Sequence, residues 1–172
     1  MDLRPLDETV SVAPMLEPGD MALLAATGVR TIICNRPDGE VPPSHRAAVM
    51  QEAAEAAGMS FVYNPVTMPS LTVEAVEEQA DALEEGEGGV VAYCASGTRS
   101  AILWALAMAG RMPVDDILRR TARHRRGTPG PGTAPSRCDA PPRARNLRDR
   151  PLPAPIPPAT PCHPPRIAAA AI

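Results

Sequence analysis

The sequence predicts an α/β layer fold with a mostly parallel central sheet of about four strands. Short β-branched, apolar segments alternate with helix-forming segments over residues 1–118. The segment VRTIIC, residues 29–34, has the composition of a strand buried on both faces. Glycines such as Gly28 and Gly58 follow the helix-forming segments, where helices commonly end.

The individual elements follow from local patterns. Four segments have the pattern of strands, and they are residues 9–13, 29–34, 60–63 and 90–93. Five have helical patterns, and they are residues 21–26, 45–57, 73–84, 99–109 and a last helix that opens at Pro113. Ser44 and Thr72 are expected to cap the helices that follow them. Because ligands bind beyond the carboxyl ends of parallel strands, the loop after residues 90–93 is the first candidate site.

The composition divides the chain at Leu118. Residues 1–118 hold 18 of the 20 acidic residues and 6 of the 17 arginines, a net charge of −12. Residues 119–172 hold 2 acids, 11 arginines and 13 of the 22 prolines, a net charge of +9. We therefore expect a catalytic domain over residues 1–118 and a Pro/Arg-rich disordered tail over residues 119–172, because such a composition cannot bury enough apolar surface to offset its ordering entropy.

Several interpretations of this tail remain open. The first interpretation is a basic arm that binds nucleic acid or acidic partners. The second is a segment that docks on the acidic body of the same chain. The third interpretation is a frameshift product, because high-GC coding DNA read out of frame is rich in arginine, proline and alanine. On that interpretation the helix that opens at Pro113 stops after Leu118.

Other features limit the class of protein. The sequence contains no run of 18 apolar residues, so no membrane span is predicted, and its N-terminus has no secretory pattern. We therefore expect a cytoplasmic protein without a membrane partner. The acidic body argues against nucleic acid as its partner. The four cysteines have no metal-ligand spacing, so neither a metal nor another cofactor is expected.

The loop after residues 90–93 carries the chemistry. It reads Cys94-Ala95-Ser96-Gly97-Thr98-Arg99-Ser100. Cys94 and Arg99 are the candidate catalytic residues, because a thiolate is a strong nucleophile and a guanidinium grips two oxygens at once. The backbone N–H groups of the loop and of the following helix N-terminus favour an anion. The candidate anion-binding residues are Ala95, Ser96, Gly97, Thr98 and Ser100.

Two further residues are weaker candidates for the site. Arg36 and Asp38 lie in the loop after residues 29–34, which ends at the same edge of the sheet, so they are candidates for the mouth of the pocket; the alternative is a turn with a surface ion pair. Cys34 lies inside an apolar strand and is expected to be a core residue.

The segment CASGTRS after an apolar strand resembles the loop of cysteine-dependent phosphatases and rhodaneses. The body, with VSVAPMLEPGDMALLAATGVRTIICNRPDGE, FVYNPVT and YCASGTRS, resembles the beta-lactamase-hydrolase-like, phosphatase-like domain family over about residues 5–118. This resemblance implies a three-layer fold like that of dual-specificity phosphatases. It also implies either a phosphatase or a sulfurtransferase.

The sequence favours sulfur transfer between these two activities. Four residues separate Cys94 from Arg99, as in rhodaneses, whereas protein tyrosine phosphatases resemble one another in having five. Tyr93 stands where that pattern has histidine, and residues 65–70 contain no acid to protonate a leaving group. Asp38 and Glu40 could supply one only if their loop folds over the site.

We therefore expect a sulfurtransferase that moves sulfane sulfur through a Cys94 persulfide between a small-molecule or protein donor and an acceptor. The alternative is a phosphatase that acts on a phosphoester through a Cys94 phosphocysteine. A second alternative is a non-catalytic anion-binding or redox-sensing module.

Overall fold

The computed structural model describes residues 1–125 of the chain. The prediction of a disordered tail covers residues 119–172, and its part from residue 126 onwards lies outside this range. Five strands form one sheet in the order β1-β2-β5-β3-β4. They are β1 (Arg4–Pro5), β2 (Val10–Ala13), β3 (Val29–Cys34), β4 (Ser60–Tyr63) and β5 (Gly89–Tyr93). Strands β2, β5, β3 and β4 are parallel to their neighbours, and β1 pairs antiparallel with β2.

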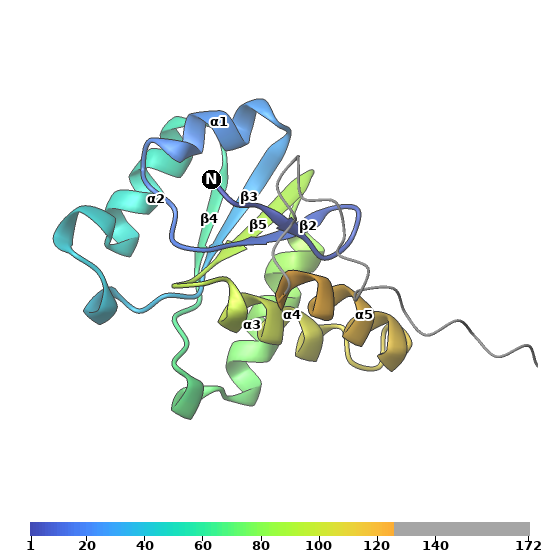
Figure 1. Cartoon of the computed structure of the whole chain (residues 1–172). Coiled ribbons are helices and arrows are strands. Elements are labelled where there is room, and N and C mark those ends of the chain that lie inside the picture. Colours follow the sequence, from blue (N-terminus) through green and yellow to red (C-terminus); the bar gives the residue numbers. More distant parts are fainter. Residues whose placement is uncertain (126–172) are drawn as a thin grey trace, which may run out of the picture. The chain divides into compact units, whose positions relative to one another are not determined.

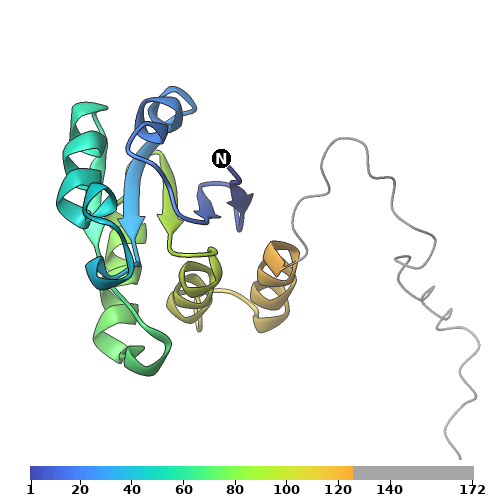
Figure 2. The ribbon, with the colours of Figure 1, turned by 60° about the vertical axis from the view of Figure 1, so that its left-hand side comes forward.

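Helices cover both faces of this sheet (Figure 1). They are α1 (Asp20–Ala26), α2 (Ala47–Ala56), α3 (Val73–Glu85), α4 (Thr98–Ala107) and α5 (Val114–Arg125). Helices α1 and α2 lie on one face, and α3, α4 and α5 lie on the other (Figures 1 and 2). The three-layer α/β fold with a mostly parallel sheet is thereby confirmed.

Each face of the sheet has its own apolar core, because successive strand residues point to opposite faces. Ile32 and Cys34 of β3 pack on the α1–α2 face with Met50, whereas Ile33 packs on the other face with the fully buried Trp104. The prediction that Cys34 is a core residue is confirmed.

Several elements differ from the sequence prediction. The two-residue strand β1 was not predicted, because its sequence Arg4–Pro5 has no strand pattern. Short 3₁₀ turns occupy Asp38–Glu40, Pro43–His45 and Met68–Ser70. Helix α2 begins at Ala47 rather than at residue 45, and Ser44 does not cap it. Thr72 does cap α3, since its hydroxyl accepts a hydrogen bond from the Ala75 N–H.

Helix α5 continues beyond Leu118 to Arg125, past the point at which the frameshift interpretation ends the last helix. Ile117 anchors this helix in the core with 6% of its surface exposed. Arg120 extends the anchoring beyond Leu118, since its Nη1 donates to the Leu6 carbonyl at 2.8 Å. The division drawn at residue 118 therefore falls inside a helix. None of the helices in residues 1–125 has the length and hydrophobicity that a membrane span needs.

Candidate active site

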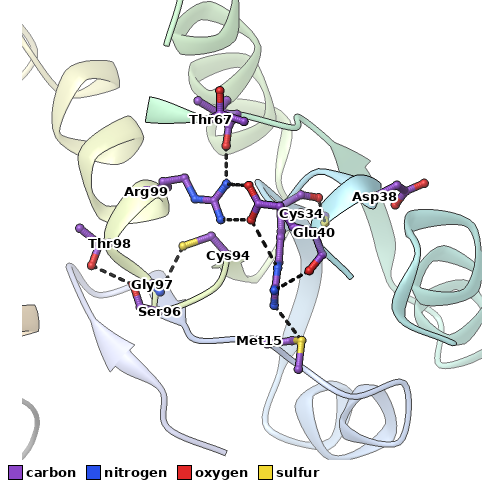
Figure 3. Close-up of polar contacts among 12 residues, drawn as sticks. Met15, Cys34, Asp38, Glu40, Thr67, Cys94, Ser96, Gly97, Thr98 and Arg99 are labelled. Atoms are coloured by element: carbon purple, nitrogen blue, oxygen red, sulfur yellow. Dashed lines mark hydrogen bonds and ion pairs between the residues drawn. The ribbon is translucent and has the colours of Figure 1, made fainter. Parts of the chain in front are cut away.

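The candidate nucleophile lies one residue beyond the end of a central strand. The Cys34 and Tyr93 positions are paired across β3 and β5, so the loops after both strands begin side by side at the carboxyl edge of the sheet. Cys94 is 1% exposed at the start of the β5 loop. Gly97, immediately before α4, has φ +84°, a left-handed conformation that favours glycine. This turn points the Gly97 N–H at Cys94 Sγ, 3.2 Å away (Figure 3).

The loop backbone sets the charge of this thiol. Burial by itself would raise the pKa of Cys94, because a charged group loses its water. Backbone N–H groups of Ser100, Ser96, Arg99 and Gly97 act in the opposite direction and lower the pKa overall. Backbone N–H groups of the loop and of the first turn of α4 therefore favour the thiolate form of Cys94, which is the nucleophilic form of a cysteine.

Arg99 lies on the first turn of α4 and is held from two sides. Its Nη1 donates to the Val66 carbonyl at 2.7 Å. Its two terminal nitrogens form a bidentate pair with the Glu40 carboxylate, at 2.9 Å from Nη1 to Oε1 and 2.6 Å from Nη2 to Oε2 (Figure 3). The side chain is 12% exposed, and its pKa is raised, chiefly by the hydrogen bond to Glu40.

Glu40 is therefore a site residue that the sequence identified only conditionally. The loop after β3 does fold over the site, and the Glu40 carboxylate reaches the guanidinium of Arg99 across 59 positions of sequence. The hydrogen bond from Arg99 lowers the pKa of Glu40, despite the opposing effect of partial burial. The sequence signal that could have identified Glu40 is its position in the loop after a parallel strand, four residues after Arg36, because such loops lie at the edge of the sheet where ligands bind.

The two residues proposed for the pocket mouth are placed differently. Arg36 lies beside the site: its Nη2 donates to the Glu40 carbonyl at 2.7 Å, and its Nε is 3.6 Å from Glu40 Oε2. Asp38 instead faces α2, where its Oδ1 accepts a hydrogen bond from the Ala47 N–H at 2.7 Å. This carboxylate caps the helix in the role predicted for Ser44.

The walls of the site come from three loops. A cavity of about 420 Å³ opens beside Arg99, and it is lined by Glu40, Thr67, Met68, Ser96, Thr98 and Arg99. Arg4 of β1 braces the loop from outside, since its Nη1 donates to the Ser96 carbonyl at 3.2 Å. The Ser96 hydroxyl in turn donates to Thr98 Oγ1. Ser100 is fully buried, and its hydroxyl has no hydrogen-bond partner among the described residues.

A buried amide cluster supports two of these loops from below. Asn35 Nδ2 donates to Gln79 Oε1 at 2.9 Å and to the Asn64 carbonyl at 3.1 Å. The Val66 N–H donates to the Asn35 carbonyl, so the cluster also fixes the peptide next to the one that holds Arg99. The loops after β3 and β4 are thereby tied to helix α3.

Comparisons with known proteins identify the family of this domain. The family described as "Beta-lactamase hydrolase-like protein, phosphatase-like domain" matches residues 2–111. The chain belongs to this family. A beta-lactamase hydrolase-like protein of Agrobacterium fabrum is 37% identical over 111 residues, which are 63% of this chain and 25% of that protein. One of Xylella fastidiosa Temecula1 is 32% identical over 68% of this chain and 28% of its own length. The chain thus matches about a quarter of the length of these relatives.

Solved structures give the fold of this phosphatase-like domain. A candidate phosphatase from Neisseria meningitidis Z2491 is 36% identical, with a TM-score of 0.64, and the match covers 72% of this chain and 89% of that one. Tk-PTP in its active form has a TM-score of 0.58 at 20% identity over 75% of this chain and 84% of its own, a likeness of fold. These findings support a phosphatase-like domain, which was the alternative, and they give no support to the sulfurtransferase that we expected from the loop length.

Proposed function

We propose that this domain is a cysteine-dependent phosphatase that hydrolyses phosphoric monoesters through a Cys94 phosphocysteine. The observation that carries the proposal is the loop around Cys94, in which backbone N–H groups stabilise a thiolate and Arg99 lies on the following helical turn. A phosphoryl group has the charge and the oxygens that such N–H groups and a guanidinium bind. Family membership supports the same assignment.

The reaction proceeds in two displacements. Cys94 Sγ attacks phosphorus, the bond from phosphorus to the ester oxygen breaks, and its electron pair leaves with that oxygen, which takes a proton from solvent. Water then attacks the phosphocysteine and loses a proton, the S–P bond breaks, and inorganic phosphate leaves while sulfur returns to the thiolate. In both steps Arg99 and the loop N–H groups hold the phosphoryl oxygens where negative charge develops.

The carboxylates of the site narrow the substrate class. Glu40 is the acid that contacts Arg99, but this bidentate pair lowers its pKa, so it is poorly suited to donate a proton to a leaving alkoxide. Asp38 is engaged with the N-terminus of α2. We therefore propose substrates whose leaving groups are stable as anions, namely aryl or acyl phosphates.

One observation favours a second candidate function, sulfur transfer. Only four residues separate Cys94 from Arg99, and a smaller loop suits a persulfide sulfur as well as a phosphoryl group. A donor such as thiosulfate releases sulfite, a stable anion that needs no general acid. The two functions use the same nucleophile and differ in substrate.

A paired assay of the full chain tests both candidates. We expect hydrolysis of p-nitrophenyl phosphate, slower hydrolysis of an alkyl phosphate, and no transfer of sulfur from thiosulfate to a thiol. Cys94→Ser should abolish turnover, and Arg99→Ala should lower kcat/KM roughly 100-fold, as the loss of an oxyanion-binding group does. Sulfur transfer without phosphate release would refute the phosphatase, and full phosphatase activity in Cys94→Ser would refute the nucleophile.

A further inference from the structure

The Glu40 carboxylate occupies the two terminal nitrogens of Arg99, a pair of groups that can also bind an anionic substrate. Both terminal nitrogens of the guanidinium contact it, at 2.9 Å to Oε1 and 2.6 Å to Oε2. A guanidinium binds two oxygens of a phosphoryl group with the same fork that it offers a carboxylate. An anion that docks bidentately on these two terminal nitrogens must therefore displace Glu40.

The guanidinium of Arg36 lies close enough to Glu40 to bind its carboxylate after displacement. Arg36 Nε is 3.6 Å from Glu40 Oε2, close enough for an ion pair and too far for a hydrogen bond. This Nε is buried and has no hydrogen-bond partner among the described residues. The rest of the guanidinium is already fixed, because Nη2 donates to the Glu40 carbonyl at 2.7 Å and Nη1 contacts Met15 Sδ at 2.8 Å. A small rotation of the Glu40 side chain would bring it onto Nε.

We propose that Glu40 is an intramolecular gate that exchanges between two arginines: paired with Arg99 it closes the anion site, and it turns to Arg36 when an anion takes its place. The proposal rests on the proposed function for the identity of that anion, a phosphate group. The exchange keeps the carboxylate paired in both states, so opening does not leave a partly buried charge alone. Glu40 is 36% exposed, which keeps the closing ion pair weak enough for a phosphate to displace.

Two substitutions are expected to change phosphate affinity in opposite directions. Glu40→Gln removes the competing charge, so inorganic phosphate should bind more tightly, by about three- to tenfold. Arg36→Gln removes the alternative partner of Glu40, so displacement becomes costlier, and the affinity should fall by roughly threefold. In the Glu40→Gln background no carboxylate is left to pair with Arg36, so adding Arg36→Gln should change the phosphate affinity little.

Calorimetric titration of the full chain with inorganic phosphate measures all of these affinities. Glu40→Ala is the second variant at the gate, because a glutamine amide oxygen can still accept a hydrogen bond from Arg99. Glu84→Gln is the matched control for net charge, since Glu84 is an exposed α3 residue that pairs with Arg111. Circular dichroism of each variant establishes that the fold is retained.

The outcomes separate the gate from the proposed activity. Opposite shifts in the two single variants, together with a double variant that binds phosphate as tightly as Glu40→Gln does, support the exchange. Equal affinities in the wild type, Glu40→Gln and Glu40→Ala, including undetectable binding in all three, would overturn it. An equal effect of Arg36→Gln in both backgrounds would overturn the role of Arg36. If these shifts occur but no phosphoester is hydrolysed, the gate stands and the phosphatase assignment fails. If phosphoesters are hydrolysed but the shifts do not occur, the phosphatase assignment stands and the gate fails.

Discussion

Cys94 is deeply buried, and yet its pKa is lowered, because four backbone N–H groups outweigh the cost of desolvation. The difference in ultraviolet thiolate absorbance between the wild type and Cys94→Ser should therefore titrate below the ordinary range of a thiol. Because the pKa is lower in the folded chain than in the unfolded one, the thiolate stabilises the fold above the unfolded pKa. That contribution is lost as the pH falls through the folded pKa.

Gly97→Ala is the informative variant for this titration. The left-handed φ of +84° at Gly97 costs a residue with a side chain roughly 1 kcal/mol, and the strain should move the N–H that contacts Cys94 Sγ. We expect the thiolate midpoint of this variant to rise toward the ordinary value. Gly19→Ala is a suitable control, because a Cβ added at Gly19 meets no atom within 4 Å. An unchanged midpoint in Gly97→Ala would show that the loop turn does not set the pKa.

Local sequence patterns predicted some of the site residues and missed others, and the reason is physical. Cys94 and Arg99 lie five positions apart on a strand–loop–helix junction, so local rules place them together. Glu40 is 59 residues from Arg99, and Arg4 contacts a loop 92 residues away. Whether such side chains meet depends on the path of each loop over the sheet, which local patterns do not determine.

Between elements, the amide cluster links the loops after β3 and β4 to α3. Gln79 is fully buried, and its Oε1 accepts a hydrogen bond from Asn35 Nδ2. Gln79→Ala leaves that donor with one acceptor fewer and opens a cavity, so the free energy of unfolding should fall by about 1–3 kcal/mol. Urea denaturation measures the loss. Gln51→Ala is the control, because Gln51 lies exposed on α2 and donates to the exposed Glu55 of the same helix; an equal effect there would exclude a special role for the cluster.

The elements themselves were predictable where a repeating pattern exists. The four parallel strands and the cores of five helices follow from apolar periodicity, and Thr72 caps α3 as its position indicates. The start of α2 was not predictable, because its first N–H group, that of Ala47, donates to Asp38 from an earlier loop rather than to the adjacent Ser44. Strand β1 is two residues long and depends on its antiparallel neighbour β2, so it has no pattern of its own.

For residues 1–125 as a whole, the central sheet is shared by two apolar cores. Ile32 on one face and Ile33 on the other belong to the same strand, so the α1–α2 layer and the α3–α4–α5 layer depend on one another through β3. We expect the two layers to unfold together, as a small domain with one shared sheet does. Trp104, the single tryptophan of the chain, reports on the α3–α4–α5 face alone.

Met50→Ala tests this coupling from the opposite face. Met50 is fully buried against α1 and the sheet, and its truncation should cost about 2–5 kcal/mol. If the layers are coupled, the Trp104 fluorescence transition in urea should shift by the same free energy as the circular dichroism transition, although Trp104 lies in the other core. Ile117→Ala, on the face of Trp104, provides the comparison. A Trp104 transition that responds to Ile117→Ala and ignores Met50→Ala would mean that the two layers unfold independently, and that the sheet does not couple them.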